Sequence, residues 1–497
     1  MKQTVAHSAM TERTTIFLTG PQKMLVDNEW IESTFGETFT TVNPANGNLL
    51  AKVPLADERD VNHAVTVARK AFNTVWKEGI RPAERADLLW KLATLLERDL
   101  QTLMELETLD NGKPLDKAKY DVLGAIAHLK YYAGWATKIE GTTIPTDQNK
   151  LVYTKKEPLG VVGLIVPWNF PLMIAMWKLA PALACGNCCI LKPAEQTPLT
   201  ALYLGKLIVE AGFPAGVVNI LTGPGLPTGQ AISQHKDIDK ISFTGSTAVG
   251  KKIMKTAAKS NLKKVSLELG GKSPNVIFED ADLETLFKSL PWSSFYNTGQ
   301  ECTLGSRIYV QESIFEKSVE FLKEKAVNMT IGNGLENPDL GPMVSIEQLN
   351  RVLDYIAIGK NEGVELVCGG NRLDGKLTEG YFLAPTIFST QNEDVTILKE
   401  EIFGPVVVVS KFKDFDEVIK KANNTDYGLA AAVWTKDLSK AHRFANAVDA
   451  GTVWINGYDL FDAAVPFGGF KQSGNGKEMG KSAIDLYTKE KAVWTVL

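Results

Sequence analysis

The sequence of 497 residues has few cysteines and few histidines, five of each. An odd number of cysteines in a long chain argues against a disulfide framework and favours a reducing compartment, of which the cytoplasm is the simplest. The one CxxC spacing, Cys185 to Cys188, has no second pair and no adjacent histidine, so we expect no metal site. No HExxH or GxSxG motif occurs, which argues against zinc hydrolases and serine esterases.

Long apolar runs and a strong net charge are also missing. The longest apolar runs, such as residues 161–166, are far too short to cross a bilayer, and no basic and then apolar leader opens the chain. A net charge of −4 does not provide the concentrated basic surface that nucleic acid requires. We therefore expect a protein that is not secreted and that binds neither membrane nor nucleic acid.

The apolar pattern changes along the chain. A polar, aperiodic segment up to about Lys23 predicts a loosely packed tail, and helical spacing then predicts helices near residues 61–75, 82–110 and 118–138. After Gly141, short runs rich in valine and isoleucine alternate with helical segments. These predicted strands lie near residues 160–166, 188–191, 217–221, 240–243, 265–267, 275–278, 306–311, 405–412, 430–434 and 451–455. Such alternation predicts an α/β fold with parallel sheets covered on both faces.

Several chemically useful residues directly follow predicted strands. They are Asn169, Lys192, Gly223, Gly245 and Glu268. Because sites in parallel sheets lie at the carboxyl ends of the strands, we expect these residues to line one crevice.

A nucleotide signal follows the predicted strand at 240–243. Residues 245–250, GSTAVG, open a helix, where glycines and the helix N-terminus suit a pyrophosphate. Glu195, three residues after Lys192, can accept hydrogen bonds from ribose hydroxyls and would repel a 2′-phosphate, which favours NAD over NADP. The GxG at 474–476 follows no buried strand, so we interpret it as a loop.

Two alternative functions remain open at this stage. Residues 245–252, GSTAVGKK, are one residue short of a P-loop, and residues 276–280 could form its acidic partner strand. Lys252, however, stands where a serine or threonine should hold magnesium, which disfavours a nucleotide hydrolase. The other alternative is a catalytically idle protein, which would normally lack a nucleophile or a base.

Cys302 has the setting of a nucleophile. It ends the segment YNTGQEC at 296–302, and the chain also supplies a carboxylate at Glu268 and an amide donor at Asn169. A thiol, a base and a donor for an oxyanion are together what acyl transfer needs. We expect the remaining cysteines to be structural, and they are Cys185, Cys188, Cys189 and Cys368.

With these residues in place, the chain resembles the aldehyde dehydrogenase superfamily from about Val26 to its end, most closely the branch of retinal and broad-range enzymes. The resemblance rests on PWNFP at 167–171, KPAEQTP at 192–198, FTGS at 243–246, LELGGKSP at 267–274, EEIFGPV at 400–406 and PFGGFKQSGNG at 466–476. It implies two Rossmann-type parallel-sheet domains with a small oligomerisation β-extension. The implied parts are an NAD-binding domain at 1–138 and 161–271, a catalytic domain at 272–475, and oligomerisation segments at 139–160 and 476–497.

The resemblance also implies roles for individual residues. Cys302 would attack an aldehyde to give a thiohemiacetal and then a thioester, with Asn169 stabilising the oxyanion and Glu268 as general base. Lys178 and Glu478 match a proton-relay pair. The implied NAD contacts are Trp168, Lys192, Glu195, Gly245, Ser246, Glu401 and Phe403.

The implied substrate tunnel is apolar. Its residues are Gly124, Phe170, Trp177, Tyr296, Phe461 and Phe467. A glycine at the mouth leaves room for a bulky chain, which favours broad-range or bulky apolar aldehydes such as retinal. The alternative is a cationic substrate such as betaine aldehyde, since aromatic walls attract quaternary ammonium groups and Asp459 and Asp462 could add negative charge.

Two residues near the nucleophile depart from the family pattern. Leu304 stands where the family usually has alanine, and Glu301 places an acid directly before Cys302. A carboxylate that faced inward would raise the pKa of the thiol, and we expect Glu301 to point away.

The resemblance implies a sheet shared between subunits. Residues 151–154 and 492–497 are apolar and β-prone, as such edges need to be. An apolar C-terminal strand of this kind would aggregate if it were left uncovered, so we expect a homodimer or homotetramer.

Overall fold

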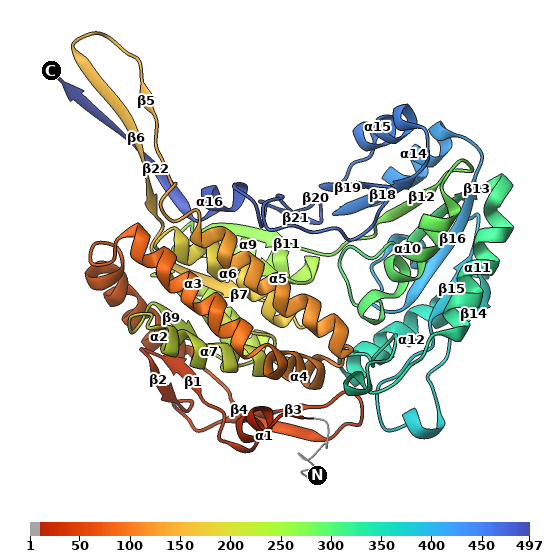
Figure 1. The fold of residues 1–497 in the computed structure, drawn as a ribbon, viewed down its shortest axis with the longest axis horizontal. Helices are drawn as coiled ribbons and strands as arrows, with labels where there is room; N and C mark the ends of the chain where they lie inside the picture. Colours follow the sequence, from red (N-terminus) through yellow and green to blue (C-terminus); the bar gives the residue numbers. More distant parts are fainter. Residues whose placement is uncertain (1–9) are drawn as a thin grey trace.

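The computed structural model describes residues 10–497, and its core is formed by two separate twisted sheets (Figure 1). The first sheet has the strand order β2-β1-β9-β8-β7-β10-β11-β21. Its strands are β1 (Met24–Val26), β2 (Glu29–Ile31), β7 (Val161–Ile165), β8 (Cys188–Lys192), β9 (Val218–Ile220), β10 (Lys240–Thr244), β11 (Lys264–Glu268) and β21 (Gly474–Asn475). The five central strands, β9 to β11, are parallel, as the strand–helix alternation predicted.

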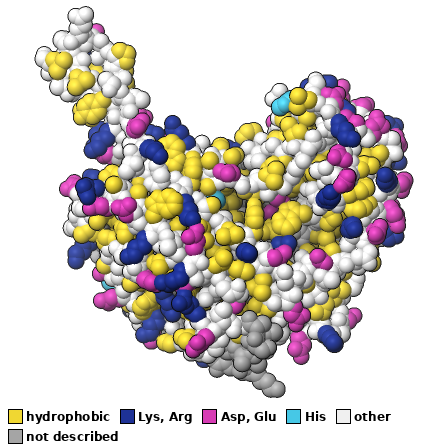
Figure 2. All heavy atoms as spheres, in the orientation of Figure 1, with side chains coloured by type: hydrophobic (Ala, Val, Ile, Leu, Met, Phe, Trp, Pro, Cys, Tyr) yellow, Lys and Arg dark blue, Asp and Glu magenta, His cyan; other side chains and the backbone are white. Residues whose placement is uncertain are grey.

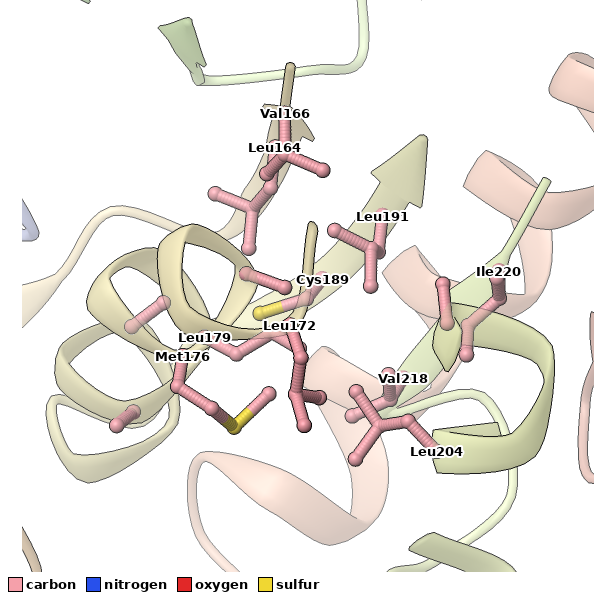
Figure 3. Close-up of a cluster of buried hydrophobic side chains, with 14 of the residues drawn as sticks. Leu164, Val166, Leu172, Met176, Leu179, Cys189, Leu191, Leu204, Val218 and Ile220 are labelled. Atoms are coloured by element: carbon pink, nitrogen blue, oxygen red, sulfur yellow. The ribbon is translucent and has the colours of Figure 1, made fainter. Parts of the chain in front are cut away.

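Helices from the first half of the chain pack around this sheet (Figure 1). They are α1 (Glu12–Thr19), α2 (Glu58–Ala71), α3 (Pro82–Arg98), α4 (Leu100–Asn111), α5 (Leu115–Ala133), α6 (Pro171–Ala184), α7 (Leu199–Ala211), α8 (Gln230–Gln234) and α9 (Thr247–Ser260). Figure 3 shows how the core is built at α6: Leu172, Met176 and Leu179 point toward side chains of β7, β8 and β9. Each such buried side chain contributes about 1.5–3 kcal/mol, which fixes α6 and the loop before it on the sheet.

The second sheet has the strand order β14-β15-β16-β13-β12-β18-β19, and all but β14 are parallel. Its strands are β12 (Pro274–Ile277), β13 (Arg307–Gln311), β14 (Glu365–Cys368), β15 (Thr386–Ser389), β16 (Val406–Phe412), β18 (Ala430–Trp434) and β19 (Thr452–Ile455). The helices of this half are α10 (Leu283–Phe295), α11 (Phe315–Asn328), α12 (Ile346–Asn361), α13 (Thr396–Lys399), α14 (Phe415–Asn423) and α15 (Leu438–Ala447).

A third, antiparallel sheet forms an arm that projects from the first body and carries the C-terminus (Figure 1). Its strands are β5 (Thr143–Ile144), β6 (Lys150–Pro158) and β22 (Thr488–Val496), and the short helix α16 (Ser482–Leu486) precedes β22. Two small ribbons complete the fold, β3 (Thr38–Val42) with β4 (Leu49–Pro54), and β17 (Tyr427–Gly428) with β20 (Phe470–Lys471). No helix between residues 10 and 497 is long and apolar enough to cross a bilayer.

The structure corrects the sequence-based boundaries in three places. Residues 12–19 of the expected tail form α1, because Phe17 and Leu18 are buried against the core, whereas residues 1–9 lie outside the described part. The helix predicted at 82–110 is interrupted at Asp99, whose carboxylate is bound by Tyr203 and Arg98. The helix predicted to reach residue 138 ends at Ala133, before Gly134.

The GxG segment at 474–476 is not a simple loop. Gly474 and Asn475 form β21, which pairs antiparallel with the end of β11. A side chain at Gly474, whose φ is +141°, would collide with the Leu267 carbonyl oxygen, so glycine is what allows the two backbones to pair. This pairing closes the edge of the first sheet beside Glu268.

Candidate active site

The chain crosses from the first sheet to the second directly after β11. Glu268 is the last residue of β11, and residues 269–273 lead into β12 at Pro274. Asn169 and Gly245, which follow strands of the first sheet, line one cavity with Cys302, which lies in the turn before β13 of the second sheet.

The backbone before Cys302 is held in an unusual conformation. Asn297, Thr298 and Gly299 all have positive φ, at +48°, +56° and +67°. Only glycine fits at position 299, since a Cβ there would collide with the carbonyl oxygen of Gly404. The Asn297 amide donates to the carbonyl oxygen of Asn169 at 3.1 Å, which ties the turn to the PWNFP loop. Non-glycine residues in this region cost of order 1–3 kcal/mol each, and such strain is typical of functional sites.

Two cavities meet at Cys302. The first cavity is lined by Pro167, Trp168, Asn169, Ile174, Thr244, Gly245, Ser246, Leu269, Gly270, Cys302, Gln348, Arg351, Glu401 and Phe403. The second cavity is lined by Tyr120, Phe170, Met173, Ile174, Trp177, Thr244, Glu268, Leu269, Trp292, Tyr296, Glu301, Cys302, Thr303, Asp459, Phe461 and Phe467. Cys302 belongs to the wall that both share, so its thiol can face one ligand from each side.

The charges around Cys302 are negative. Burial raises the pKa of the Cys302 thiol well above its usual range, and the carboxylates of Glu301, Glu401 and Glu268 raise it further. The expectation that Glu301 points away is wrong: Glu301 is buried and lines the second cavity. Leu304 is buried, and nothing in the structure explains why it replaces alanine.

Glu268 has the environment of a general base. Its carboxylate lines the second cavity, is buried, and has no hydrogen-bond partner at either oxygen. Burial raises the pKa of Glu268 well above its usual range, and Glu478 raises it further, while Lys178 and Lys477 act in the opposite direction. A carboxylate with a raised pKa is a stronger base than an exposed one, which suits proton abstraction from water.

Asn169 is fixed by a set of buried hydrogen bonds. Its side-chain amide donates to the Gln300 carbonyl oxygen at 3.1 Å, which leaves one of its two hydrogens for a ligand. The backbone carbonyl oxygen of Asn169 accepts a hydrogen bond from Lys113 Nζ at 2.7 Å. The Asn111 side-chain amide donates to the backbone carbonyl oxygen of Trp168 at 2.8 Å. Residues 111–113, which follow the predicted helix at 82–110, therefore support the loop that holds Asn169.

Five of the seven predicted cofactor contacts line the first cavity, namely Trp168, Gly245, Ser246, Glu401 and Phe403. Ser246 caps α9, whose N-terminus opens on the cavity. Glu401 accepts from the Gly271 N–H at 2.9 Å, and burial raises its pKa to about 7. Lys192 and Glu195 do not line this cavity. Lys192 instead donates to the carbonyl oxygens of Pro193 and Gly223 at 2.7 and 2.8 Å.

The predicted relay pair is in contact. Lys178 and Glu478 are buried and 2.7 Å apart, and both bind the hydroxyl of Ser242. Glu478 is close enough to Glu268 to raise its pKa, so the pair lies behind the candidate base. Ser242 was missed in the sequence because a serine inside a buried strand carries no motif.

The predicted aromatic residues line the second cavity. Trp177, Phe461 and Phe467 pack with ring centroids 5.4–6.2 Å apart, and Phe170 stacks on Tyr296. Gly124 does not line this cavity, and a Cβ there would lie 3.0 Å from the sulfur of Met173. The space beside the glycine is therefore taken by Met173.

Sequence reasoning missed further residues of both cavities. They are Gln348 and Arg351 in the first, and Tyr120, Met173, Trp292 and Thr303 in the second. Asp459 lines the second cavity, whereas Asp462 is exposed and accepts from the Ala464 N–H. The four other cysteines are free, and burial raises the pKa of Cys185 to about 12. Within residues 10–497, no group of three His, Cys, Asp or Glu side chains is placed to hold a metal ion.

Comparison with known proteins identifies the family. The aldehyde dehydrogenase family matches residues 30–493. The chain belongs to this family. It is 51% identical to an aldehyde dehydrogenase of Emericella nidulans, over 95% of each chain, and 51% identical to retinal dehydrogenase 2 of Gallus gallus, over 95% of this chain and 91% of that one. The NAD⁺ complex of an aldehyde dehydrogenase from Bacillus cereus superposes with a TM-score of 0.96 at 49% identity, over 98% and 99% of the two chains.

Family membership confirms the resemblance, the α/β fold and the assignment to the enzymes that oxidise aldehydes. It also removes the nucleotide-hydrolase alternative. In the structure, residues 276–280 begin in β12 of the second sheet, so they are not a partner strand for β10 in the first.

Proposed function

We propose that this aldehyde dehydrogenase converts aldehydes to carboxylic acids with NAD through a thioester on Cys302. The observation that carries the proposal is the position of Cys302 in the wall shared by two cavities. One cavity ends at the N-terminus of α9, which suits a pyrophosphate, and the other is walled by aromatic side chains. NAD is supported by the Bacillus cereus relative, which was solved as its NAD⁺ complex.

The residues of the first cavity fit a dinucleotide. Gly245 and Ser246 lie at the N-terminus of α9, where they would hold a pyrophosphate, and Phe403, which packs edge to face on Trp168 with ring centroids 5.2 Å apart, would lie beside the nicotinamide. Lys192 ends β8 and Glu195 follows three residues later, where the two would hold the adenosine ribose, and Glu195 would repel a 2′-phosphate. Bound NAD supplies a hydride acceptor.

Cys302 begins the reaction, because an aldehyde carbon must become tetrahedral before it can release hydride. The Cys302 thiol first gives its proton to water. The thiolate then forms a bond to the aldehyde carbon, and the carbonyl oxygen takes the displaced electron pair as an oxyanion. The free hydrogen of the Asn169 amide and the backbone N–H of Cys302 are the donors for that oxyanion. Loss of hydride leaves a thioester on Cys302.

Glu268 completes the reaction by removing a proton from water. The hydroxide adds to the thioester carbon, the bond to the Cys302 sulfur breaks, and the carboxylic acid leaves. Lys178 and Glu478, which lie behind Glu268, would then carry the proton away. The raised pKa of Glu268 keeps it basic enough for this step.

The walls of the second cavity support a substrate with an apolar body. Phe170, Trp177, Phe461 and Phe467 favour broad-range or bulky aldehydes, such as the retinal after which the Gallus gallus relative is named. A cationic aldehyde such as betaine aldehyde is the second candidate, favoured by the acid Asp459 in the same wall.

The arm supports assembly into a homodimer or homotetramer. Leu151, Tyr153, Trp494, Val496 and Leu497 are exposed along it, and Figure 2 shows apolar side chains gathered there. Exposed apolar strand edges are normally covered by another chain.

The five free cysteines fit a reducing compartment such as the cytoplasm, which cell fractionation would test.

The test is to mix the protein with NAD or NADP and with retinal, hexanal, acetaldehyde or betaine aldehyde, and to follow absorbance of the reduced cofactor. We expect NAD to be preferred, retinal or hexanal to exceed acetaldehyde in kcat/KM, and Cys302→Ser to abolish turnover. Near-normal turnover by Cys302→Ser would contradict the reaction. A clear preference for acetaldehyde would contradict the substrate.

A further inference from the structure

Two carboxyl groups face the second cavity in a position that the oxidation of an aldehyde does not require. Glu301 and Asp459 are 5% and 8% exposed, and both line this cavity beside Cys302. Thr303 donates its hydroxyl to Asp459 Oδ1 at 3.0 Å, which fixes that side chain. Glu301 Oε2 and Asp459 Oδ2 have no hydrogen-bond donor.

No basic side chain neutralises this pair in the part of the chain that the structure describes. The groups with the largest influence on Glu301 and Asp459 are each other, Thr303 and the more distant Asp121. Burial and Asp459 raise the pKa of Glu301, and burial raises the pKa of Asp459 to about 7. The two carboxyl groups lie within hydrogen-bonding reach of each other, and negative charge on either is costly in an apolar cavity unless a cation faces it.

A third unpartnered acceptor lies in the same cavity. The hydroxyl of Tyr296 is buried, with the residue 6% exposed, and it has no hydrogen-bond partner. The ring of Tyr296 stacks between Phe170 and Trp292, with centroids 6.2 and 4.0 Å away. Negative charge and aromatic faces both favour a cation.

The number of acceptors distinguishes two kinds of cation. A primary ammonium has three N–H donors, and Glu301, Asp459 and Tyr296 each leave one oxygen without a donor. A quaternary ammonium has no donor, so it would leave all three oxygens unsatisfied. A neutral alkyl chain would also leave the negative charge of the pair without a partner.

We propose that Glu301, Asp459 and Tyr296 form a subsite for a primary ammonium group, so that the preferred substrates are aldehydes with a protonated amine at the far end of an apolar chain. This inference rests on the proposed aldehyde oxidation and narrows its substrate class. It makes Glu301 a specificity-determining residue.

The test compares pairs of aldehydes that differ only in the terminal group. For 3-aminopropanal against butanal, and 6-aminohexanal against heptanal, we expect at least one amine to have the higher kcat/KM. The ratio of amine to alkanal should fall about tenfold or more in Glu301→Gln and in Asp459→Asn, since each change removes a charge-assisted hydrogen bond. Asp462→Asn, a matched change of an exposed carboxylate outside the cavity, should leave the ratio unaltered.

Several results would overturn the subsite. One is an amine-to-alkanal ratio of kcat/KM below one for both chain lengths. Another is a ratio that Glu301→Gln and Asp459→Asn leave unchanged. A third is oxidation of betaine aldehyde as efficient as that of the aldehydes with a primary amine. If the enzyme oxidises neither amines nor alkanals, the proposed function itself fails. Calorimetry with n-butylammonium and the NAD-loaded protein then tests the subsite alone. Binding that Glu301→Gln weakens supports it, and no binding to the wild type refutes it.

Discussion

At the scale of single residues, the site is governed by carboxylates that surround one thiol. Glu301, Glu401 and Glu268 all raise the pKa of Cys302, and none of the groups that act most strongly on this pKa is a cation. The thiol is therefore mostly protonated in the free enzyme at neutral pH, and it depends on ligands to become a nucleophile. Cys302, Glu268 and Asn169 became candidates through their motifs, but the direction of the Glu301 side chain could not be predicted, because Asp459, which lies beside it, comes from a distant part of the chain.

Glu301→Gln should make Cys302 more reactive toward alkylation. Removal of the negative charge stabilises the thiolate, so the pKa of the thiol falls and iodoacetamide inactivates the enzyme faster at a given pH near neutrality. The measurement is the pH profile of the inactivation rate, which should shift to lower pH. Glu284→Gln, an exposed change on α10, is the control, and a profile that shifts equally in both variants or in neither would contradict this account.

Asn169→Ala should reduce kcat by roughly 10²–10³-fold, because one donor to the oxyanion is lost while the nucleophile stays in place. The change in KM should be small, since the contact forms mainly in the transition state. Steady-state kinetics with hexanal measures both values. A variant with near-wild-type kcat would show that Asn169 serves only to hold the turn at Gln300.

At the scale of elements, the turn at residues 296–299 positions Cys302, and the geometry of this turn could not be predicted. The ten predicted strands are present, because burial of a parallel strand leaves a continuous apolar run, but β14 and β15 of the second sheet were not predicted. Breaks that depend on tertiary contacts were missed, such as the one where Asp99 meets Tyr203. The pairing of β21 with β11 was also missed, because a two-residue strand has no apolar pattern.

Gly299→Ala should lower both the melting temperature and the activity strongly. Its Cβ would collide with the carbonyl oxygen of Gly404, and its φ of +67° is strained for alanine. Gly363→Ala is the matched control, since Gly363 has a φ of +76° but no atom within 4 Å of the added Cβ. We expect the control to cost only about 1 kcal/mol in unfolding free energy. Equal losses in the two variants, measured by thermal unfolding, would show that the collision is unimportant.

At the scale of the whole molecule, the arm extends away from both large sheets (Figure 1), and Cys302 lies in the turn before β13 of the second sheet. The α/β class was predictable because the pattern of apolar residues along the chain shows strands alternating with helices. The proposed division into a cofactor side and an aldehyde side rests on the family motifs, since residues on both sides of Cys302 come from distant segments. The pattern of apolar residues could not predict that β10 and β12 belong to different sheets. This separation argues against a P-loop at 245–252 with residues 276–280 as its partner strand.

Trp494→Glu should break the assembly. Trp494 is 63% exposed on β22, and a charge there would disfavour burial of the arm against another subunit. Light scattering should give a multiple of 54.4 kDa for the wild type and a smaller mass for the variant. Trp90→Glu, at an exposed tryptophan on α3, should keep the wild-type mass. A monomeric wild type would contradict the proposed oligomer.

The most direct test of the central claim is the mass of the protein during turnover. Glu268→Gln retains the nucleophile but removes the base, so the thioester should accumulate after mixing with hexanal and NAD. We predict that intact-mass spectrometry finds one added acyl group per chain, that peptide mapping places it on Cys302, and that hydroxylamine removes it. A protein that reduces NAD stoichiometrically but never gains this mass would contradict the mechanism.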